Sequence, residues 1–169
     1  VRGEVRPQFC HALDAVPTLL DMLKVQPPAA VQGVPQMPIE GESFAASLHD
    51  AAALPRNSTQ YFEMFGHRGL WSQGWKAVAF HPPGTPFDAD RWELYQLDHD
   101  FAEVHDLSAE QPERLKVLVD LWWQQAEAHQ VLPLDDRFGP RFVESARRHH
   151  GPRRHFVFHA GVGHIPSDV

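Results

Sequence analysis

The sequence has one cysteine, Cys10, among 169 residues, which excludes an internal disulfide framework. Positive charge is also scarce, because 15 lysines and arginines stand against 22 aspartates and glutamates, for a formal net charge of -7. Nucleic acids select a basic face, and anionic membranes attract basic segments. No apolar run reaches the length of a membrane-spanning helix. We therefore expect neither nucleic acid nor a membrane as a partner.

Several catalytic motifs are missing from the sequence as well. It has no Gly-x-Ser-x-Gly, no glycine loop for a phosphate and no dinucleotide fingerprint. A nucleophilic cysteine needs an activating base and a positive or dipolar setting. His11 follows Cys10 directly, but adjacent side chains diverge. We expect Cys10 to be a small, buried and inert residue beside Phe9.

What the sequence does contain is enough apolar material for a core, since 43% of its residues are hydrophobic. From Phe9 to Val25, apolar residues recur every three or four positions and predict a helix, with Asp14 as a candidate N-cap. Prolines end this helix. An irregular passage follows, with one or two helical turns between Ser43 and Leu48.

The pattern changes after this passage. Four short segments are rich in aromatic and branched residues and are separated by glycine and proline: "QYFEMFG", "RGLWSQG", "WKAVAFH" and "RWELYQL". They predict an antiparallel meander from about residue 59 to about residue 97. An apolar stripe then predicts a long helix, capped by Ser108 and running from Ala109 to about Gln130. The predicted fold class is α+β: a small antiparallel sheet of about four strands with one long helix packed on a face. Beyond it we expect a helical turn at residues 141–149 and a strand at 155–160.

The connection between the last predicted strand and the long helix is acidic. It holds Asp98, His99, Asp100, Glu103, His105 and Asp106. Carboxylates and imidazoles can bind a cation, but a calcium loop of the EF-hand type needs a glycine in its middle, which is lacking here. We favour a solvated turn near the positive end of the helix, with a metal site as the alternative. The histidines at 149, 150 and 155 are flanked by arginines, which favours a basic surface patch over a metal site.

His67 and Arg68 lie at the turn between the first two predicted strands. Such a turn can contact a partner domain or an anionic ligand, because loops and turns carry much of the binding function of proteins. An ordinary exposed turn explains the same two residues. They are the candidate substrate-binding residues of this sequence.

Four stretches in order resemble the C-terminal part of the type I sulfatases, the arylsulfatase-like members of the alkaline phosphatase superfamily. They are "DAVPTLLDML", "VQGVPQMPIEGESF", "QYFEMFGHRGLWSQGWKAVAFH" and the acidic connection that begins "ELYQLDHD". Together they span about residues 10 to 135. The resemblance implies that the fold is the C-terminal subdomain of an alkaline phosphatase-like sulfatase, and that His67 and Arg68 border the mouth of a pocket for an anionic sulfate ester.

The resemblance also implies a chemistry whose main parts are not in this sequence. Such sulfatases hydrolyse a sulfate ester with a formylglycine made from a [Cys/Ser]-x-Pro-x-Arg motif, and a calcium ion polarises the sulfate. Cys10 is followed by "HALD", so that motif is absent, and the family's metal-binding pair of aspartates, which lies upstream of the helix that "DAVPTLLDML" resembles, is missing too. We expect no catalytic residue, metal ligand or cofactor in this chain. Calcium and formylglycine are expected in a missing catalytic domain, without which the chain is expected to be inactive.

The expected organisation follows from the same resemblance. Residues 1–136 would form the sulfatase C-terminal subdomain, with 1–57 as the end of the preceding catalytic domain. Residues 137–169 would be a basic tail and the start of a further region. The first helix and the irregular passage would pack on the missing α/β domain, and a small-molecule sulfate ester would bind through that domain. The alternatives are a stand-alone, non-catalytic binding or interaction module with this subdomain, and a metal-binding protein.

Overall fold

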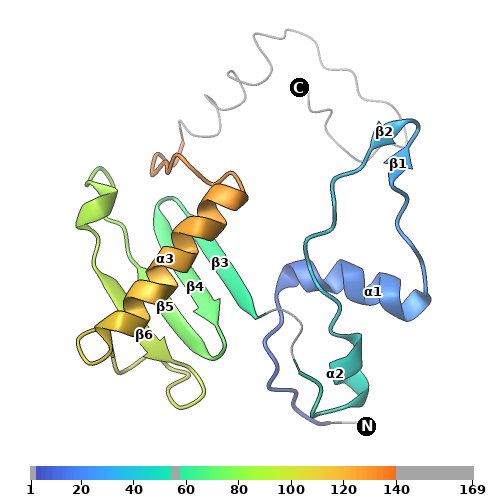
Figure 1. The fold of residues 1–169 in the computed structure, drawn as a ribbon, viewed down its shortest axis with the longest axis horizontal. Coiled ribbons are helices and arrows are strands. Elements are labelled where there is room, and N and C mark those ends of the chain that lie inside the picture. Colours follow the sequence, from blue (N-terminus) through green and yellow to red (C-terminus); the bar gives the residue numbers. More distant parts are fainter. Residues whose placement is uncertain (1–2, 55–57, 140–169) are drawn as a thin grey trace, which may run out of the picture. The chain divides into compact units, whose positions relative to one another are not determined.

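The structure is a computed structural model that describes residues 3–54 and 58–139, and the chain divides into two compact units between Gln60 and Tyr61. The first unit contains the 3-10 helix η1 (Ala12–Asp14), helix α1 (Ala15–Leu23), strands β1 (Ala30–Val31) and β2 (Val34–Pro35), and helix α2 (Ala45–His49). The second contains the sheet and helix α3 (Pro112–Ala128) (Figure 1). Among the described residues, no helix is both long enough and apolar enough to span a membrane.

Polar contacts connect α1 to the segment before α2. Asp14 is buried and accepts the backbone N–H groups of His11 at 2.7 Å and Glu42 at 2.9 Å. The Thr18 hydroxyl accepts the N–H of Phe44 at 3.0 Å. Asp14 occupies the N-cap position of α1, as expected, but its side chain makes no capping bond to α1. The carboxylate instead completes the capping box of η1 with His11 and accepts from Glu42.

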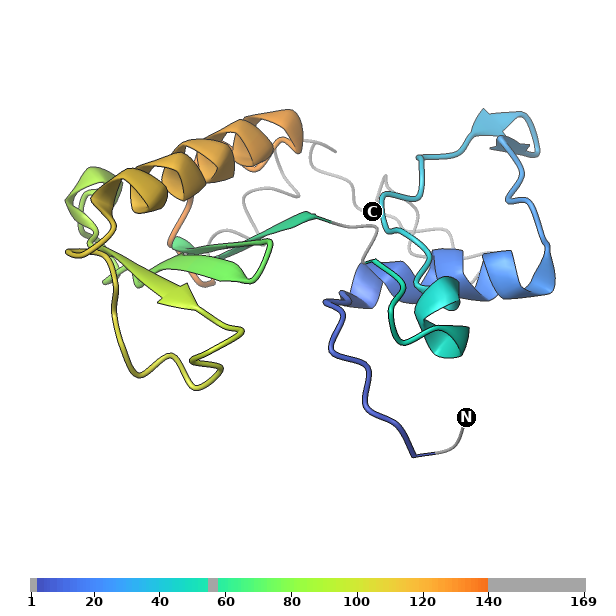
Figure 2. The ribbon, with the colours of Figure 1, turned by 60° about the horizontal axis from the view of Figure 1, so that its bottom comes forward.

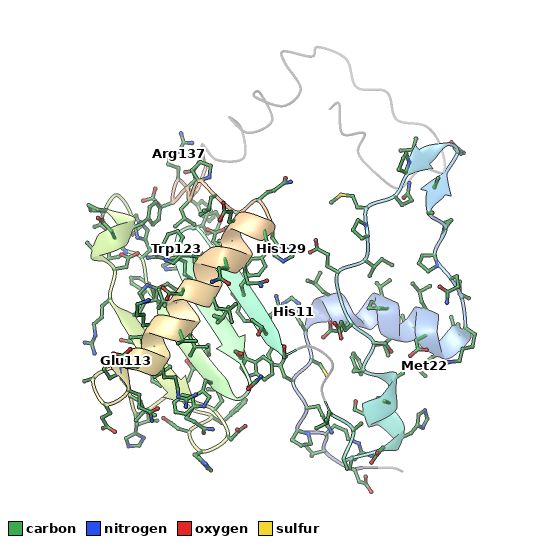
Figure 3. All side chains as sticks on the ribbon, viewed as in Figure 1. His11, Met22, Glu113, Trp123, His129 and Arg137 are labelled. Atoms are coloured by element: carbon green, nitrogen blue, oxygen red, sulfur yellow. The ribbon has the colours of Figure 1, made fainter. Side chains whose placement is uncertain are left out.

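The apolar side chains of α1 are exposed rather than buried. The buried residue of the helix is Thr18, while apolar residues of η1 and α1 face solvent: Leu13, Val16, Leu19, Met22 and Leu23. Met22 marks the C-terminal half of the helix in Figure 3. The predicted helix is confirmed, but within its own unit it leaves an apolar face without a cover.

The irregular passage contains one hairpin that the sequence did not indicate. Strands β1 and β2 pair antiparallel, with Val31 opposite Val34. The two residues between them, Gln32 and Gly33, have positive φ angles of 51° and 82°. Positive φ at both turn positions is typical of the tight hairpin turn whose twist matches that of the strands. Glycine adopts it freely, but Gln32 gives no signal for it.

The second unit, with Thr59 and Gln60 at the start of its first strand, confirms the predicted meander. Its strands are β3 (Thr59–Met64), β4 (His67–Ser72), β5 (Trp75–Ala79) and β6 (Trp92–Gln96), in the order β3-β4-β5-β6. Helix α3 lies across one face of this sheet (Figure 2). The core between them consists of Leu70, Ala77, Leu94, Leu118, Trp122 and Ala126. The buried positions of α3 fall four residues apart, so one stripe of the helix covers the sheet, as predicted.

Helix α3 begins later than the sequence indicated. It starts at Pro112 rather than Ala109, and Gln111 precedes it with φ -130° and ψ 59°. Proline has no N–H to bond and disfavours helical geometry in the residue before it, which fixes the start. Ser108 does not cap α3, since its hydroxyl contacts Asp106 at 3.0 Å. The helical turn and strand expected at 141–149 and 155–160 lie outside the described residues, and the boundary at 136 stays a prediction.

Candidate functional site

The turn between β3 and β4 positions the two predicted site residues. Phe65 and Gly66 both have positive φ, 52° and 87°, and the Gly66 N–H donates to Glu63 Oε1 at 2.9 Å. A Cβ on Gly66 would approach His81 Cδ2 to 2.6 Å, so only glycine fits the turn there. His67 and Arg68 follow as the first residues of β4. Side chains alternate along a strand, so these two point to opposite faces of the sheet.

Arg68 points into the interior, towards α3. Its side chain is 1% exposed and pairs with Asp90, whose side chain is 2% exposed. It also donates to the Phe87 carbonyl at 3.1 Å. Its guanidinium carbon lies 5.2 to 5.8 Å from the centroids of four aromatic rings: Phe87, Trp92, Trp122 and Trp123. Trp123 lies on α3 (Figure 3). Burial lowers the pKa of Arg68 and the Asp90 carboxylate opposes that shift, so the pair is a buried ion pair in an aromatic cage.

His81 joins the same cluster from the end of β5. Its imidazole is fully buried, with Nδ1 2.8 Å from Asp90 Oδ2 and Nε2 3.4 Å from Asp136 Oδ2. The ring stacks on Phe87 with the centroids 4.1 Å apart. Asp136, from the segment after α3, accepts the Gly84 N–H, which holds the pKa of this carboxyl below its ordinary value. Asp90 is thus shared by Arg68 and His81, and the cluster connects β4, β5 and the loop before β6.

His67 lies on the sheet face opposite α3 and is held by the same cluster. The backbone N–H of His81 donates to His67 Nδ1 at 3.0 Å, and the His67 ring packs on Phe80 with the centroids 4.6 Å apart. A neutral imidazole that accepts at Nδ1 carries its hydrogen on Nε2. His67 therefore presents an N–H donor in a fixed orientation.

The structure separates the two predicted site residues. Arg68 is taken up by Asp90 and the aromatic cage, whereas His67 remains half-buried on the other face. Their assignment to a substrate stays a prediction. Sequence reasoning missed His81, Asp90 and Asp136, because their cluster forms from three segments with no fixed spacing. A histidine ending an apolar strand was the one available signal.

Two aspartates of the acidic connection, Asp100 and Asp106, accept hydrogen bonds from backbone N–H groups. Asp100 Oδ2 accepts the N–H groups of Val104 and His105, both at 2.8 Å, and Asp106 Oδ1 accepts those of Leu94 at 3.0 Å and Ser108 at 2.9 Å. The bonds from His105 and Val104 lower the pKa of Asp100. The pKa of Asp106 is also lowered, since its hydrogen bonds outweigh the opposing effect of burial. These contacts support the interpretation as a turn. Within residues 3–54 and 58–139, no three His, Cys, Asp or Glu side chains are grouped to hold a metal ion.

Cys10 differs from its expected burial. It is exposed, and its thiol donates to the Gln8 carbonyl at 3.6 Å. The expectation of a buried residue is wrong because Cys10 precedes η1 in an extended segment that packs little of its surface. Partial burial and the nearby Asp14 raise the pKa of the thiol. A raised pKa reduces the thiolate fraction, which is the reverse of what a nucleophile needs.

Comparisons of the sequence with known protein families and with individual proteins both find sulfatases. The profile of the family described as "N-sulphoglucosamine sulphohydrolase, C-terminal" matches residues 1–130. An uncharacterized sulfatase of Schizosaccharomyces pombe is 26% identical over 135 residues, which cover 78% of this chain and 24% of the relative. The chain therefore spans about a quarter of that relative's length.

Two solved structures share the fold. One is a protein in complex with its substrate D-glucosamine-2-N,6-O-disulfate, with a TM-score of 0.50 and 22% identity; the match covers 74% of this chain and 25% of that one. The other is Ps i-CgsB, with a TM-score of 0.53 and 16% identity over 82% of this chain and 31% of that one. At these identities the likeness concerns the fold.

Proposed function

The chain belongs to the N-sulphoglucosamine sulphohydrolase C-terminal family, and from this premise we propose that it is the C-terminal portion of a longer sulfatase that hydrolyses sulfate esters. The observation that carries the proposal is the family match over residues 1–130. It agrees with the α+β fold of the second unit, which the two solved structures share. The relatives are much longer than this chain, so the catalytic groups would lie in the remainder of the protein.

The exposed face of α1 supports a role in completing that larger protein. Val16, Leu19 and Leu23 are apolar and exposed, and exposed apolar patches mark surfaces that another domain or protein covers. We propose that this face packs on the catalytic α/β domain. Formylglycine and calcium would belong to that domain, because the 169 residues contain no [Cys/Ser]-x-Pro-x-Arg motif and their described part holds no cluster of metal ligands.

Within this chain, His67 is the residue proposed to contact the substrate. Its Nε2–H can donate to a sulfate oxygen, and the bond from the His81 N–H fixes its ring. Arg68 would have a structural role rather than contact the substrate, because its guanidinium is already paired with Asp90. Its expected contact with the anionic substrate would require the pair to open, at the cost of leaving a buried carboxylate unpaired.

The proposed substrates are sulfated sugars, as the family description indicates. One relative of the same fold was solved with D-glucosamine-2-N,6-O-disulfate as its substrate, so this compound is the first to test. The alternative is a stand-alone binding module. The core that the second unit forms between α3 and the sheet favours this alternative, because a unit with its own core can fold without a catalytic domain.

Reading the coding sequence upstream of Val1, in frame, and expressing the complete protein tests the proposal. We expect a Cys-x-Pro-x-Arg or Ser-x-Pro-x-Arg motif upstream and release of sulfate from D-glucosamine-2-N,6-O-disulfate or 4-nitrophenyl sulfate. Calcium chelation should abolish release, and the 169-residue chain alone should release none. A start codon within a few residues of Val1, or a complete protein that hydrolyses no sulfate ester, would favour the binding module instead.

A further inference from the structure

A groove lies beside Phe80, at the end of β5. Its volume is about 310 Å³, and its lining includes Phe80, Pro82, Thr85, Ala89, Arg91 and Glu93. This volume is at the lower end of the range of small-molecule sites. The loop between β5 and β6 supplies most of the wall, so the groove is built within the second unit.

Phe80 has the geometry of a binding platform. Its side chain is 71% exposed, although large aromatic residues usually bury most of their surface. The His67 ring packs on Phe80, and His67 does not line the groove, whereas Phe80 does. We infer that His67 supports the phenyl ring from outside the groove and leaves the ring available to a ligand within it.

The His67 ring that packs on Phe80 is held in place by a chain of buried polar contacts. His67 is fixed by the His81 N–H, and the His81 ring is fixed by Asp90, which also holds Arg68. The side chains of Arg68, His81 and Asp90 are at most 2% exposed. Packing of this kind preorganises a site, because little conformational entropy is left to lose when a ligand binds.

The polar lining of the groove indicates the class of ligand. Arg91 contacts Asp106 at 2.6 Å and Glu93 accepts from the Tyr95 hydroxyl at 2.8 Å. A guanidinium has five N–H groups and a carboxylate about four lone pairs, so one contact leaves capacity on each. Thr85 adds a hydroxyl. A hydrophobic platform flanked by donors and acceptors suits a pyranose, whose C–H face is apolar and whose edge carries hydroxyl groups.

We propose that this groove binds the sugar ring of the sulfate ester, with Phe80 as the stacking platform and with Arg91 and Glu93 as specificity-determining residues. This inference rests on the proposed function for the identity of the ligand as the organic half of a substrate. It assigns no group in the groove to the hydrolysis itself.

Titration of the ¹⁵N-labelled 169-residue chain by NMR tests the groove directly. We expect D-glucosamine and D-glucosamine-2-N,6-O-disulfate to shift the backbone amides of Phe80, Thr85, Arg91 and Glu93, and sodium sulfate not to. Phe80→Ala should weaken sugar binding by about fivefold through lost stacking, and Phe80→Trp should restore it. The matched control is Phe101→Ala, because Phe101 is also largely exposed but lies in the acidic connection.

Three outcomes would overturn the groove assignment. They are shifts caused equally by sodium sulfate, equal loss of binding in Phe80→Ala and Phe101→Ala, and shifts confined to the separate hollow at Trp75, Gln96 and Gln111. The readout is independent of sulfate release. If the complete protein hydrolyses sulfate esters but the 169-residue chain shows none of these amide shifts, the groove assignment alone is refuted. If the 169-residue chain binds the sugar but the complete protein hydrolyses no sulfate ester, the proposed function alone is refuted.

Discussion

The cluster around Asp90 is the most polar part of the second unit's interior. One carboxylate accepts from both Arg68 and His81, and all three side chains are almost fully buried. Charges in such a place are tolerated only when paired, since removal of one partner leaves the other without solvation. The same carboxylate indirectly holds His67, so stability and the candidate site depend on it together.

The substitution Asp90→Ala removes the carboxylate that this cluster shares. It should lower the free energy of unfolding of the second unit by about 3–5 kcal/mol, because it leaves the Arg68 guanidinium buried and unpaired. Urea unfolding followed by tryptophan fluorescence measures the change. The control is Asp88→Ala in the same loop, where the side chain is exposed and the expected change is within about 0.5 kcal/mol. Equal effects from the two variants would contradict the importance of the pair.

Two glycines of the second unit, Gly66 and Gly84, have similar backbone angles but different surroundings. Gly66 and Gly84 have φ values of 87° and 78°, but only at Gly66 would a Cβ meet other atoms, 2.6 Å from His81 Cδ2 and 2.8 Å from Phe87 Cε1. Gly84→Ala should cost about 1–2 kcal/mol from the backbone conformation. Gly66→Ala carries that cost and the clash, so its thermal midpoint should be clearly lower. Coinciding melting curves would show that His81 and Phe87 move aside freely.

The acidic connection joins β6 to α3 through its carboxylates. Asp106 accepts from the backbone of both Leu94 and Ser108, so it fixes the end of the sheet against the approach to the helix. The sequence of this connection favoured a solvated turn and left a metal site as the alternative. The hydrogen bonds support the turn, because carboxylate oxygens of Asp100 and Asp106 accept backbone N–H groups.

Asp106→Ala should therefore have an effect on stability that depends on pH. The folded pKa of Asp106 is depressed, so its contribution is present above the unfolded value of about 3.9 and is lost as the pH falls through the folded pKa. At pH 7 we expect a loss of about 2 kcal/mol in unfolding free energy. The difference from wild type should shrink below about pH 4.

Urea unfolding from pH 2.5 to pH 7, in steps, measures this dependence. Asp120→Ala is the control, since Asp120 pairs with Lys116 on the exposed side of α3 and a surface pair contributes little. A difference between Asp106→Ala and wild type that stays constant over the whole pH range would rule out a role for the ionised carboxylate.

For the whole chain, the exposed apolar face of α1 makes a prediction about its behaviour in isolation. The 169-residue chain should bind a hydrophobic dye such as 8-anilinonaphthalene-1-sulfonate and should self-associate, because Leu13, Val16, Leu19 and Leu23 are exposed. The paired substitution Leu19→Lys and Leu23→Lys should reduce dye binding, with Val117→Lys on the exposed side of α3 as control. A low dye signal together with a sharp unfolding transition would contradict the proposal that another domain covers the apolar face of α1.

The α+β class, the order of the four strands and the helix that covers them could be predicted from the amino-acid sequence alone. These follow from local periodicity, because apolar residues at spacings of two or of three and four select the face that is buried. The residue at which helix α3 begins and the position of the short β1-β2 hairpin were less predictable. Pro112 outweighed the capping pattern at Ser108, and the Gln32–Gly33 hairpin gave only one glycine as a signal.

The different environments of the His67 and Arg68 side chains could not be predicted from the sequence and depend on how the chain packs. The two are neighbours in sequence, but strand alternation places one against Phe80 and the other inside an aromatic cage with Asp90. His81, Asp90 and Asp136 are 9 and 46 positions apart, and burial brings them together. Charge pairing at such separations leaves no periodic pattern, because it depends on which faces meet once the sheet and α3 have packed.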